Sequence, residues 1–476
     1  MPMITRRRFV TGMLFAAALP VLQACRQAPT PTSQPATSTT PQATAASGAA
    51  PAANATVQAT TAPAVASSGV ELQVSTRGAT DGDIMEKSVV AFAAQTGIKF
   101  KHVSYGGEPD YWSKVQALHA TGQVADVIWA STGNLHNFAN RGILSELDSL
   151  IAADKYDLSD YIPAGLQSMS LNGKLYGMPW GGHPGNGGLL YNVDLLNGAG
   201  FNVTEDPDSL DNWTYDTLKD AATKTTKTKD GRADTLGYSP GTDFLSLNNV
   251  LGAYGARFMT PDGKALAMDT PEFLAAMNWV RDIYMTKVSP ALDPDPTAMG
   301  NTNNELFGGG RLATLQTQYT GQFTPGEKVI QGKFKWNVGL QPKGPANKRG
   351  TALTINGMTV SAISKHKPEA WQFVKWLMEP ENQVPIILAG GSRPGLRTKV
   401  LNDERLMTQL KAHKVFVKAL LAAEPWQMPA NFRWPEFNST VQQVFAGVWS
   451  GSETVDQALP AAKKKLQEVL DKPAID

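Results

Sequence analysis

The hydrophobic residues near the start of the folded region recur first with the period of a strand and then with the period of a helix. Residues 70–74 alternate apolar and polar side chains, which predicts a β-strand. In residues 85–92 the apolar side chains recur at i, i+4 and i+7, which predicts a helix that ends at Gly97. Residues 98–103 are rich in β-branched and aromatic side chains, so we expect a second strand there.

The same alternation of elements continues to residue 130. Residues 111–118 carry a second helical stripe that ends near Gly122, and residues 124–130 are a short apolar run typical of a buried parallel strand. This order of strands and helices predicts an α/β fold on a parallel sheet with right-handed crossovers. Because ligands of open α/β sheets bind beyond the carboxyl ends of the strands, residues directly after strands are candidates for a binding site.

The first 24 residues have the pattern of an export signal. A basic run at residues 5–8 precedes a largely apolar stretch at residues 9–22, which is shorter than the roughly 20 residues of a transmembrane helix. Leu-Gln-Ala-Cys at residues 22–25 then resembles the lipobox of bacterial lipoproteins, which implies cleavage before Cys25 and lipidation of that residue. An uncleaved anchor with a reduced, inert Cys25 is the alternative. The Arg-Arg-x-Phe pattern also resembles a twin-arginine signal, with the general secretory route as the alternative.

Residues 25–69 are expected to be a lipid anchor and a linker. Residues 26–69 consist mainly of Ala, Thr, Ser, Pro and Gln, without acidic residues, Lys or aromatic residues. Such a segment cannot bury enough apolar area to offset its ordering entropy, so we expect a disordered linker that spans roughly 35–40 Å. Cleavage would remove three arginines and no acidic residue, so the mature body would be slightly acidic.

Composition and missing motifs exclude several classes of protein. The chain has 476 residues and a formal net charge of +1, which does not suit a nucleic-acid partner. One cysteine rules out a disulfide framework, a Cys-rich zinc site and a protein-ligated iron–sulfur cluster. The sequence has no Gly-x-Ser-x-Gly elbow, no phosphate-binding loop and no His-Glu-x-x-His motif. We therefore expect no metal, no cofactor and no enzymatic activity.

The segments that follow the expected strands share one chemical character. They combine aromatic rings with amides, hydroxyls and an occasional carboxylate or Arg. These groups suit a sugar, whose CH-rich face stacks on a ring while its hydroxyls exchange hydrogen bonds with planar groups. The same residue types also build ordinary turns. The segments are residues 105–108, 129–134, 179–186, 316–321, 356–358 and 392–394.

A series of short motifs runs in order through residues 70–476. They lie at residues 122–129, 138–147, 173–179, 190–196, 212–218, 306–313, 368–377 and 454–459. Together they resemble the extracellular solute-binding protein family 1, the carbohydrate-binding subunits of ABC importers, which are similar to maltose-binding protein. The sequence departs from the family pattern at Pro460, which is expected to interrupt the final helix.

The resemblance implies the fold of type II periplasmic binding proteins, an α/β fold with two lobes joined by a hinge and a ligand cleft between them. Carried over to this chain, lobe 1 takes residues 70–180 and 353–422. Lobe 2 takes residues 181–352 and 423–476.

Candidate ligand-binding residues come from the segments after the expected strands. Trp180 is placed directly after a strand and either stacks on a sugar or packs between the lobes; Trp129, Tyr319 and Trp434 have the same alternatives of stacking and packing. Glu108 accepts sugar hydroxyls or is a surface acid, and Ser131 and Thr132 bind hydroxyls or cap a helix. Arg393 reaches the ligand or a surface acid, and His183 is a ligand or an ordinary hydrogen-bonding residue. The full set is Tyr105, Glu108, Trp129, Ser131, Thr132, Trp180, Gly181, His183, Tyr319, Thr320, Asn356, Gly357, Met358, Arg393 and Trp434.

The expected function is that of a substrate-binding subunit of an ABC importer. It would capture an extracellular carbohydrate and deliver it to the permease subunits, as a monomer held on the extracytoplasmic face of the cell membrane by lipid on Cys25. One alternative is a secreted, membrane-tethered enzyme that acts on glycosides or carries a cofactor, since the separation of paired carboxylates cannot be read from sequence. A surface sugar sensor or adhesin with the same fold is the other alternative.

Overall fold

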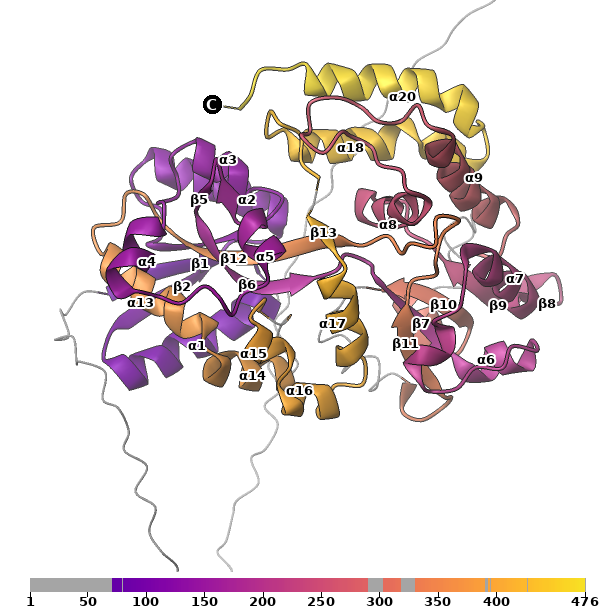
Figure 1. The fold of residues 1–476 in the computed structure, drawn as a ribbon, viewed down its shortest axis with the longest axis horizontal. Helices are drawn as coiled ribbons and strands as arrows, with labels where there is room; N and C mark the ends of the chain where they lie inside the picture. The colour runs from indigo at the N-terminus through magenta and orange to yellow at the C-terminus, as the bar shows by residue number, and fades with distance from the viewer. Residues whose placement is uncertain are drawn as a thin grey trace, which may run out of the picture. The chain divides into compact units, whose positions relative to one another are not determined.

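Two separate β-sheets organise the described part of the chain, which Figure 1 shows in chain order from indigo to yellow. The computed structural model describes residues 71–78, 80–289, 303–317, 330–389, 393, 395–425 and 427–475. The predicted signal peptide, Cys25 and the linker lie outside the described residues. The same holds for Tyr319 and Thr320.

The first sheet begins with the strands that the hydrophobic pattern predicted. β1 (Glu71–Thr76) lies between β2 (Lys99–Ser104) and β3 (Val127–Ser131), and both pairings are parallel. The predicted parallel α/β order is therefore confirmed. The sheet as a whole is mixed, because β12 (Ala352–Val360) pairs antiparallel with both β3 and β6 (Gly177–His183). The short β13 (Glu424–Pro425) pairs with β12 in parallel.

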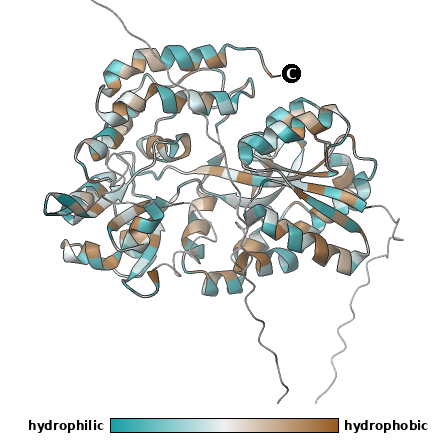
Figure 2. Cartoon of the chain, turned by 180° about the vertical axis from the view of Figure 1, so that it is seen from behind, coloured by the Kyte–Doolittle hydropathy of each residue, from teal (hydrophilic) through white to brown (hydrophobic). Residues whose placement is uncertain are grey.

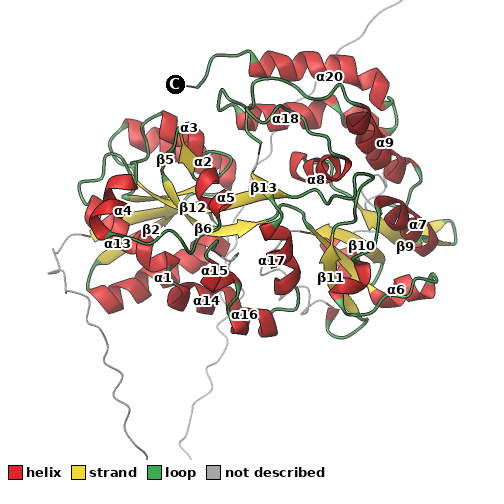
Figure 3. Cartoon of the chain, viewed as in Figure 1, coloured by secondary structure: helices red, strands yellow, loops and turns green. Residues whose placement is uncertain are grey.

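Helices cover both sheets, as Figure 3 shows in red and yellow. The core of the first sheet, which we call lobe 1, is a buried cluster that includes Phe92, Trp129, Ile355 and Phe373. Its helices carry both hydrophilic and hydrophobic residues along their length, as Figure 2 shows for helices throughout the chain. A hairpin of β4 (Ser170–Leu171) and β5 (Lys174–Leu175) precedes β6. The helices of lobe 1 are α1 (Thr80–Thr96), α2 (Glu108–Ala120), α3 (Leu135–Asn140), α4 (Asp148–Asp154), α5 (Pro163–Ser168), α13 (Lys367–Met378), α14 (Pro380–Leu388), α15 (Thr398–Leu401) and α16 (Glu404–Gln409).

The second sheet organises lobe 2. Its strand order is β11-β7-β10-β9-β8, in which β10 is antiparallel to β7 and parallel to β9. The strands are β7 (Gly188–Asn192), β8 (Lys227–Lys229), β9 (Arg232–Ser239), β10 (Leu312–Thr317) and β11 (Trp336–Leu340). The helices are α6 (Val193–Gly198), α7 (Tyr215–Thr225), α8 (Phe244–Tyr254), α9 (Pro271–Met285), α11 (Asn303–Gly308), α18 (Trp434–Val444), α19 (Ala446–Ser450) and α20 (Val455–Leu470), with a 3-10 turn at Pro207–Leu210.

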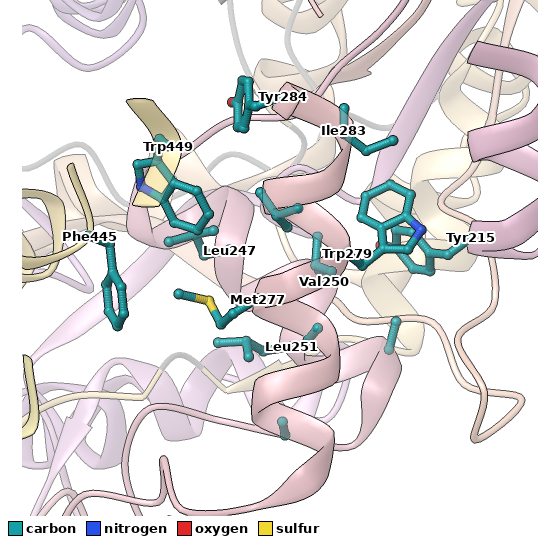
Figure 4. Close-up of a cluster of buried hydrophobic side chains, with 14 of the residues drawn as sticks. Tyr215, Leu247, Val250, Leu251, Met277, Trp279, Ile283, Tyr284, Phe445 and Trp449 are labelled. Carbon is teal, nitrogen blue, oxygen red and sulfur yellow. The ribbon is translucent and has the colours of Figure 1, made fainter. Parts of the chain in front are cut away.

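The core of lobe 2 is formed by segments that are distant in the sequence. Figure 4 shows α8 side chains such as Leu247 and Leu251 close to Met277 of α9, with Phe445 and Trp449 from the last part of the chain beside them. At the other side of α9, the ring of Trp279 meets Tyr215 edge-on, with 4.7 Å between the centroids. Residues 434–469 thus complete a core that residues 189–288 begin.

One helix packs into both lobes. α17 (His413–Leu421) places Val415 and Phe416 in a cluster with strands of the second sheet, whereas Val417 and Leu420 belong to the core of lobe 1. The side chain of Lys418 also forms an ion pair with Asp208, with 2.7 Å between Nζ and Oδ1. Both faces of α17 are therefore held by apolar contacts, each from a different lobe.

Two segments that were predicted to follow strands lie inside strands instead. Trp180, Gly181 and His183 are part of β6, and residues 356–358 are in the middle of β12. The glycines misled the prediction, because they indicated a turn. In β6 glycine is needed for close packing: a Cβ on Gly182 would lie 2.5 Å from Cδ2 of the buried Leu396.

The prediction that Pro460 interrupts the last helix is wrong. α20 is one helix from Val455 to Leu470 with Pro460 inside it. Its start is fixed by a capping box, in which Thr454 and Gln457 exchange side-chain and backbone hydrogen bonds. Its apolar face is buried in the core of lobe 2, and this packing offsets the backbone hydrogen bond that a proline removes.

Candidate functional site

A cavity of about 750 Å³ lies between elements of the two lobes. Lobe 1 contributes the ends of β1 and β3 and the helices α2 and α3, and lobe 2 contributes the start of α8 and the start of α18. β12 contributes two side chains. Its lining is Arg77, Glu108, Pro109, Trp112, Ser113, Gln116, Ser131, Thr132, Gly133, Asn137, Arg141, Asp243, Phe244, Leu245, Thr354, Asn356, Arg433, Trp434, Pro435, Glu436, Asn438 and Ile475.

A network of charged and polar groups forms the wall of the cavity in lobe 1. Arg77, just after β1, bonds Asp81 through Nε at 2.6 Å and Glu108 through Nη1 at 3.2 Å. Its guanidinium also lies over the ring of Trp129, 4.8 Å from the centroid. The other carboxylate oxygen of Glu108 accepts a hydrogen bond from Ser131 Oγ at 2.7 Å. Glu108 is thus oriented from two sides while its side chain stays partly open to solvent.

Aromatic side chains enter the cavity lining from both lobes. Trp112 of α2 packs against the hydrophobic cores of lobe 1 and lobe 2. On the opposite wall the ring of Phe244 meets Trp434 edge-on, with 4.6 Å between the centroids. The aspartate before Phe244 caps α8, since Asp243 accepts hydrogen bonds from the backbone N–H and the hydroxyl of Ser246.

Several buried polar atoms of the lining have no partner within the described protein. They are Trp112 Nε1, Asn137 Oδ1 and Thr354 Oγ1. Buried polar groups are normally hydrogen-bonded, so unpaired ones around a cavity indicate where a polar ligand or water binds. One donor, one acceptor and one hydroxyl suit a ligand that both donates and accepts, as sugar hydroxyls do.

The charges of the lining are mainly paired within the protein. Arg77 is bonded to two acids, and Arg433 lies 3.5 Å from Glu436 through Nη1 and Oε2. Arg141 donates to Gln116. A neutral, hydroxyl-rich ligand would therefore leave these ion pairs intact, whereas a charged ligand would have to compete with them.

The structure brings five of the predicted site residues together at the cavity. Glu108, Ser131, Thr132, Asn356 and Trp434 all line it. Ser131 and Asn356 face each other across the pairing of β3 and β12, which explains why distant segments meet here.

The other described candidates lie away from the lining. Trp129, Trp180 and Met358 are at most 3% exposed and belong to the core of lobe 1. Tyr105 packs on Tyr111 with 6.0 Å between ring centroids. Gly181 and Gly357 are strand residues opposite β12 and β3, respectively.

His183 and Arg393 are buried close enough to influence each other. Burial lowers the pKa of the His183 imidazole well below its ordinary value, and the charge of Arg393 adds to that effect. The Nδ1 atom of His183 lies 3.3 Å from the carbonyl oxygen of Gly185, so the ring has a backbone partner. Burial also lowers the pKa of Arg393, whose Nε atom has no hydrogen-bond partner among the described residues.

The sequence reasoning missed Arg77, Trp112, Phe244 and Asn137. Trp112 gave a signal, because it is a large aromatic residue directly beside the apolar stripe of α2 rather than on it. The signal at Asp243 and Phe244 was weaker: an Asp that is followed by an apolar residue is a pattern typical of a helix start. Nothing local marks Asn137, which reaches the cavity only through the placement of α3.

Within the described ranges, no group of three or more His, Cys, Asp or Glu side chains is placed to hold a metal ion. Among the same residues, no helix has both the length and the apolar character needed to cross a bilayer. Both statements concern only the part of the chain that the structure describes.

The fold and the site define a two-lobed protein with a cavity between its lobes. The family model of bacterial extracellular solute-binding proteins matches residues 87–414, and the chain belongs to this family. The proteins of this family are binding proteins, and its description places them outside the cell.

Named relatives agree with this assignment. A binding protein of Brucella abortus (strain 2308) is 23% identical over 430 residues, which are 85% of this chain and 97% of the relative. An ABC transporter-binding protein of Deinococcus radiodurans is 24% identical over 337 residues, 66% of this chain and 73% of the relative.

Solved structures share the fold. An ABC substrate-binding protein of Listeria monocytogenes in complex with cycloalternan has a TM-score of 0.71 and 21% identity, covering 84% of this chain and 98% of that one. The maltose-bound MalE3 of T. maritima has a TM-score of 0.68 and 19% identity, covering 84% and 99%. The predicted fold of two α/β lobes is confirmed.

Proposed function

We propose that this protein is the substrate-binding subunit of an ABC importer and that its ligand is an extracellular carbohydrate. The observation that carries the proposal is the cavity between the lobes, where Trp112, Phe244 and Trp434 supply aromatic surface beside unpaired polar atoms. Rings of this kind stack on the apolar face of a sugar, and the polar atoms bind its hydroxyls. The relative that is named an ABC transporter-binding protein and the sugar-bound structural neighbours support the same function.

Capture follows from the position of the cavity between two lobes. A ligand that contacts both walls gains interactions in the closed form that the open form cannot provide, so it shifts the population toward closure. The closed form would then dock on the permease. No bond is made or broken, and the chain needs neither a metal nor a cofactor for this role.

A thermal-shift screen of the full chain against neutral mono- and oligosaccharides tests the ligand class. A bound sugar raises the melting temperature, because it stabilises only the folded state. The screen includes uronic acids and polyols for comparison. If no carbohydrate shifts the transition while a glycoside is hydrolysed, the protein is an enzyme and the proposal is wrong.

We also propose that lipid on Cys25 holds the protein on the extracytoplasmic face of the cell membrane. The motif at residues 22–25 supports this, as does a Streptomyces antibioticus relative that is described as a lipoprotein. Replacing Cys25 by Ser in the full chain should move the protein from the membrane fraction to the soluble fraction. Retention of C25S in membranes would show that another part of the chain anchors it.

A further inference from the structure

Three contacts join the lobes along one rim of the cavity, two from α3 itself and one from Gly133, two residues before it. A Cβ on Gly133, just before α3, would lie 3.1 Å from Cδ1 of Trp434, so the indole rests against the backbone of lobe 1. The ring of His136 meets Phe432 edge-on, with 6.4 Å between centroids. Asn140 Nδ2 donates to the carbonyl oxygen of Ile475 at 3.0 Å.

The partners of α3 are held together by one buried asparagine. Asn431 Nδ2 donates to the carbonyl oxygens of Val469, Leu470 and Lys472, at 2.7, 3.2 and 3.1 Å. The backbone carbonyl oxygen of Asn431 accepts a hydrogen bond from the backbone N–H of Ile475 at 3.2 Å. We call residues 431–434 with residues 473–475 the clasp.

A second bond fixes the clasp from the neighbouring residue. Arg433 Nε donates to the carbonyl oxygen of Pro473 at 2.9 Å. The segment after α20 is thereby tied to the start of α18 at two points, and Ile475 is left in the cavity lining with its carbonyl oxygen on Asn140.

The backbone of the clasp is strained where it touches lobe 1. Phe432 has φ +60°, which a bulky side chain rarely adopts. Its backbone N–H bonds the carbonyl oxygen of Pro429 at 3.0 Å, and its ring is the group that reaches His136. The strain is therefore located at a residue whose side chain contacts the other lobe.

We propose that Asn140 and Phe432 are positioning residues for ligand capture, which act by holding the clasp of lobe 2 on helix α3 of lobe 1. None of the three contacts needs a ligand. They favour the closed arrangement in the free protein. The more of the free protein is already closed, the less of the ligand's binding free energy is needed for closure and the higher the observed affinity. This effect on affinity rests on the proposed function, whereas the effect on closure does not.

The experiment measures closure in the ligand-free protein. Spin labels are attached at Lys114→Cys on α2 and Glu468→Cys on α20, both exposed positions, in a full chain that also carries Cys25→Ser. Distances between the labels are then compared for the parent, Asn140→Ala and Phe432→Gly. Gln443→Ala is the matched control, because within the described part of the chain this amide donates a hydrogen bond to Ser439 of its own helix, at 3.2 Å, and to no residue of lobe 1.

Loss of one cross-lobe contact should raise the ratio of open to closed protein about two- to tenfold, as expected for a single hydrogen bond or ring contact. Asn140→Ala and Phe432→Gly should therefore lengthen the mean distance, whereas Gln443→Ala leaves it unchanged. Asn140 is exposed, so its variant should keep the parental melting temperature even if Phe432→Gly folds poorly. A distance distribution in folded Asn140→Ala that superimposes on the parent would overturn the proposal, whatever ligand is found.

Discussion

Trp112 is the residue at which the cavity and both hydrophobic cores meet. Replacing it by Ala removes the largest ring of the lobe 1 wall, so affinity for the carbohydrate found by thermal shift should fall at least about tenfold. The affinity of Trp112→Phe should lie between those of the parent and Trp112→Ala, because this variant keeps a ring but loses the unpaired Nε1–H.

The control for this prediction is Trp376→Phe. Trp376 is also a partly buried tryptophan of lobe 1, but its Nε1 donates to Gln95 at 2.7 Å and it does not line the cavity. Calorimetric titration should therefore give parental affinity for this variant. Equal losses in the two phenylalanine variants would remove Trp112 from the site.

Arg397 is a buried cation that organises the segment after α14. It is 8% exposed and forms ion pairs of 3.0 Å with Asp160 and Glu379, and it lies over the ring of Tyr161. Arg397→Met leaves the carboxylate of Asp160, whose side chain is only 12% exposed, without its cationic partner, so the free energy of unfolding should fall by about 3–5 kcal/mol in urea titrations.

Arg405 provides the comparison for Arg397. Its pair with Asp403 is short, at 2.8 Å, but the Arg405 side chain is 52% exposed. Arg405→Met should therefore leave the free energy of unfolding nearly unchanged, because an exposed ion pair contributes little to stability. Similar losses for the two variants would mean that burial does not decide the strength of these ion pairs.

At the scale of single elements, α20 keeps a proline that its packing tolerates. Pro460 is the sixth residue of the helix, where its missing N–H leaves the carbonyl oxygen of Asp456 without an intrahelical partner. Pro460→Ala should therefore raise the free energy of unfolding by about 1–3 kcal/mol. Pro271→Ala is the control, since Pro271 begins α9, where no intrahelical N–H bond is lost. An unchanged free energy of unfolding in Pro460→Ala would show that the helix has already adjusted to the proline.

The elements also show what the sequence could and could not predict. The hydrophobic periods gave β1 to β3 and α1 to α2 correctly, because each pattern is local. β6 and β12 were misread as loops, since their glycines are explained only by Leu396 and by strands far away in the chain. The order of the family motifs predicted two lobes, whereas only the fold could bring Trp112 to Phe244 and Trp434.

At the scale of the whole molecule, two buried histidines and one half-buried histidine link stability to pH. Burial lowers the pKa values of His136, His183 and His413, and the hydrogen bonds that their rings donate to the backbone carbonyl oxygens of Ser170, Gly185 and Leu401 only partly oppose this effect. The unfolded chain therefore binds protons more readily than the folded one near pH 6.5.

The sign of the effect follows from the lowered pKa values. The contribution of each histidine is fully present above the unfolded pKa of about 6.5 and is lost as the pH falls toward the folded value. Each can add a slope of at most about 1.4 kcal/mol per pH unit.

Urea titrations between pH 7.5 and 5.0 should thus show a free energy of unfolding that decreases as the pH is lowered. His183→Gln should flatten the profile relative to the parent, because it removes one of the three groups while keeping a polar side chain. Superimposable profiles for His183→Gln and the parent would show that this imidazole takes up its proton equally in both states.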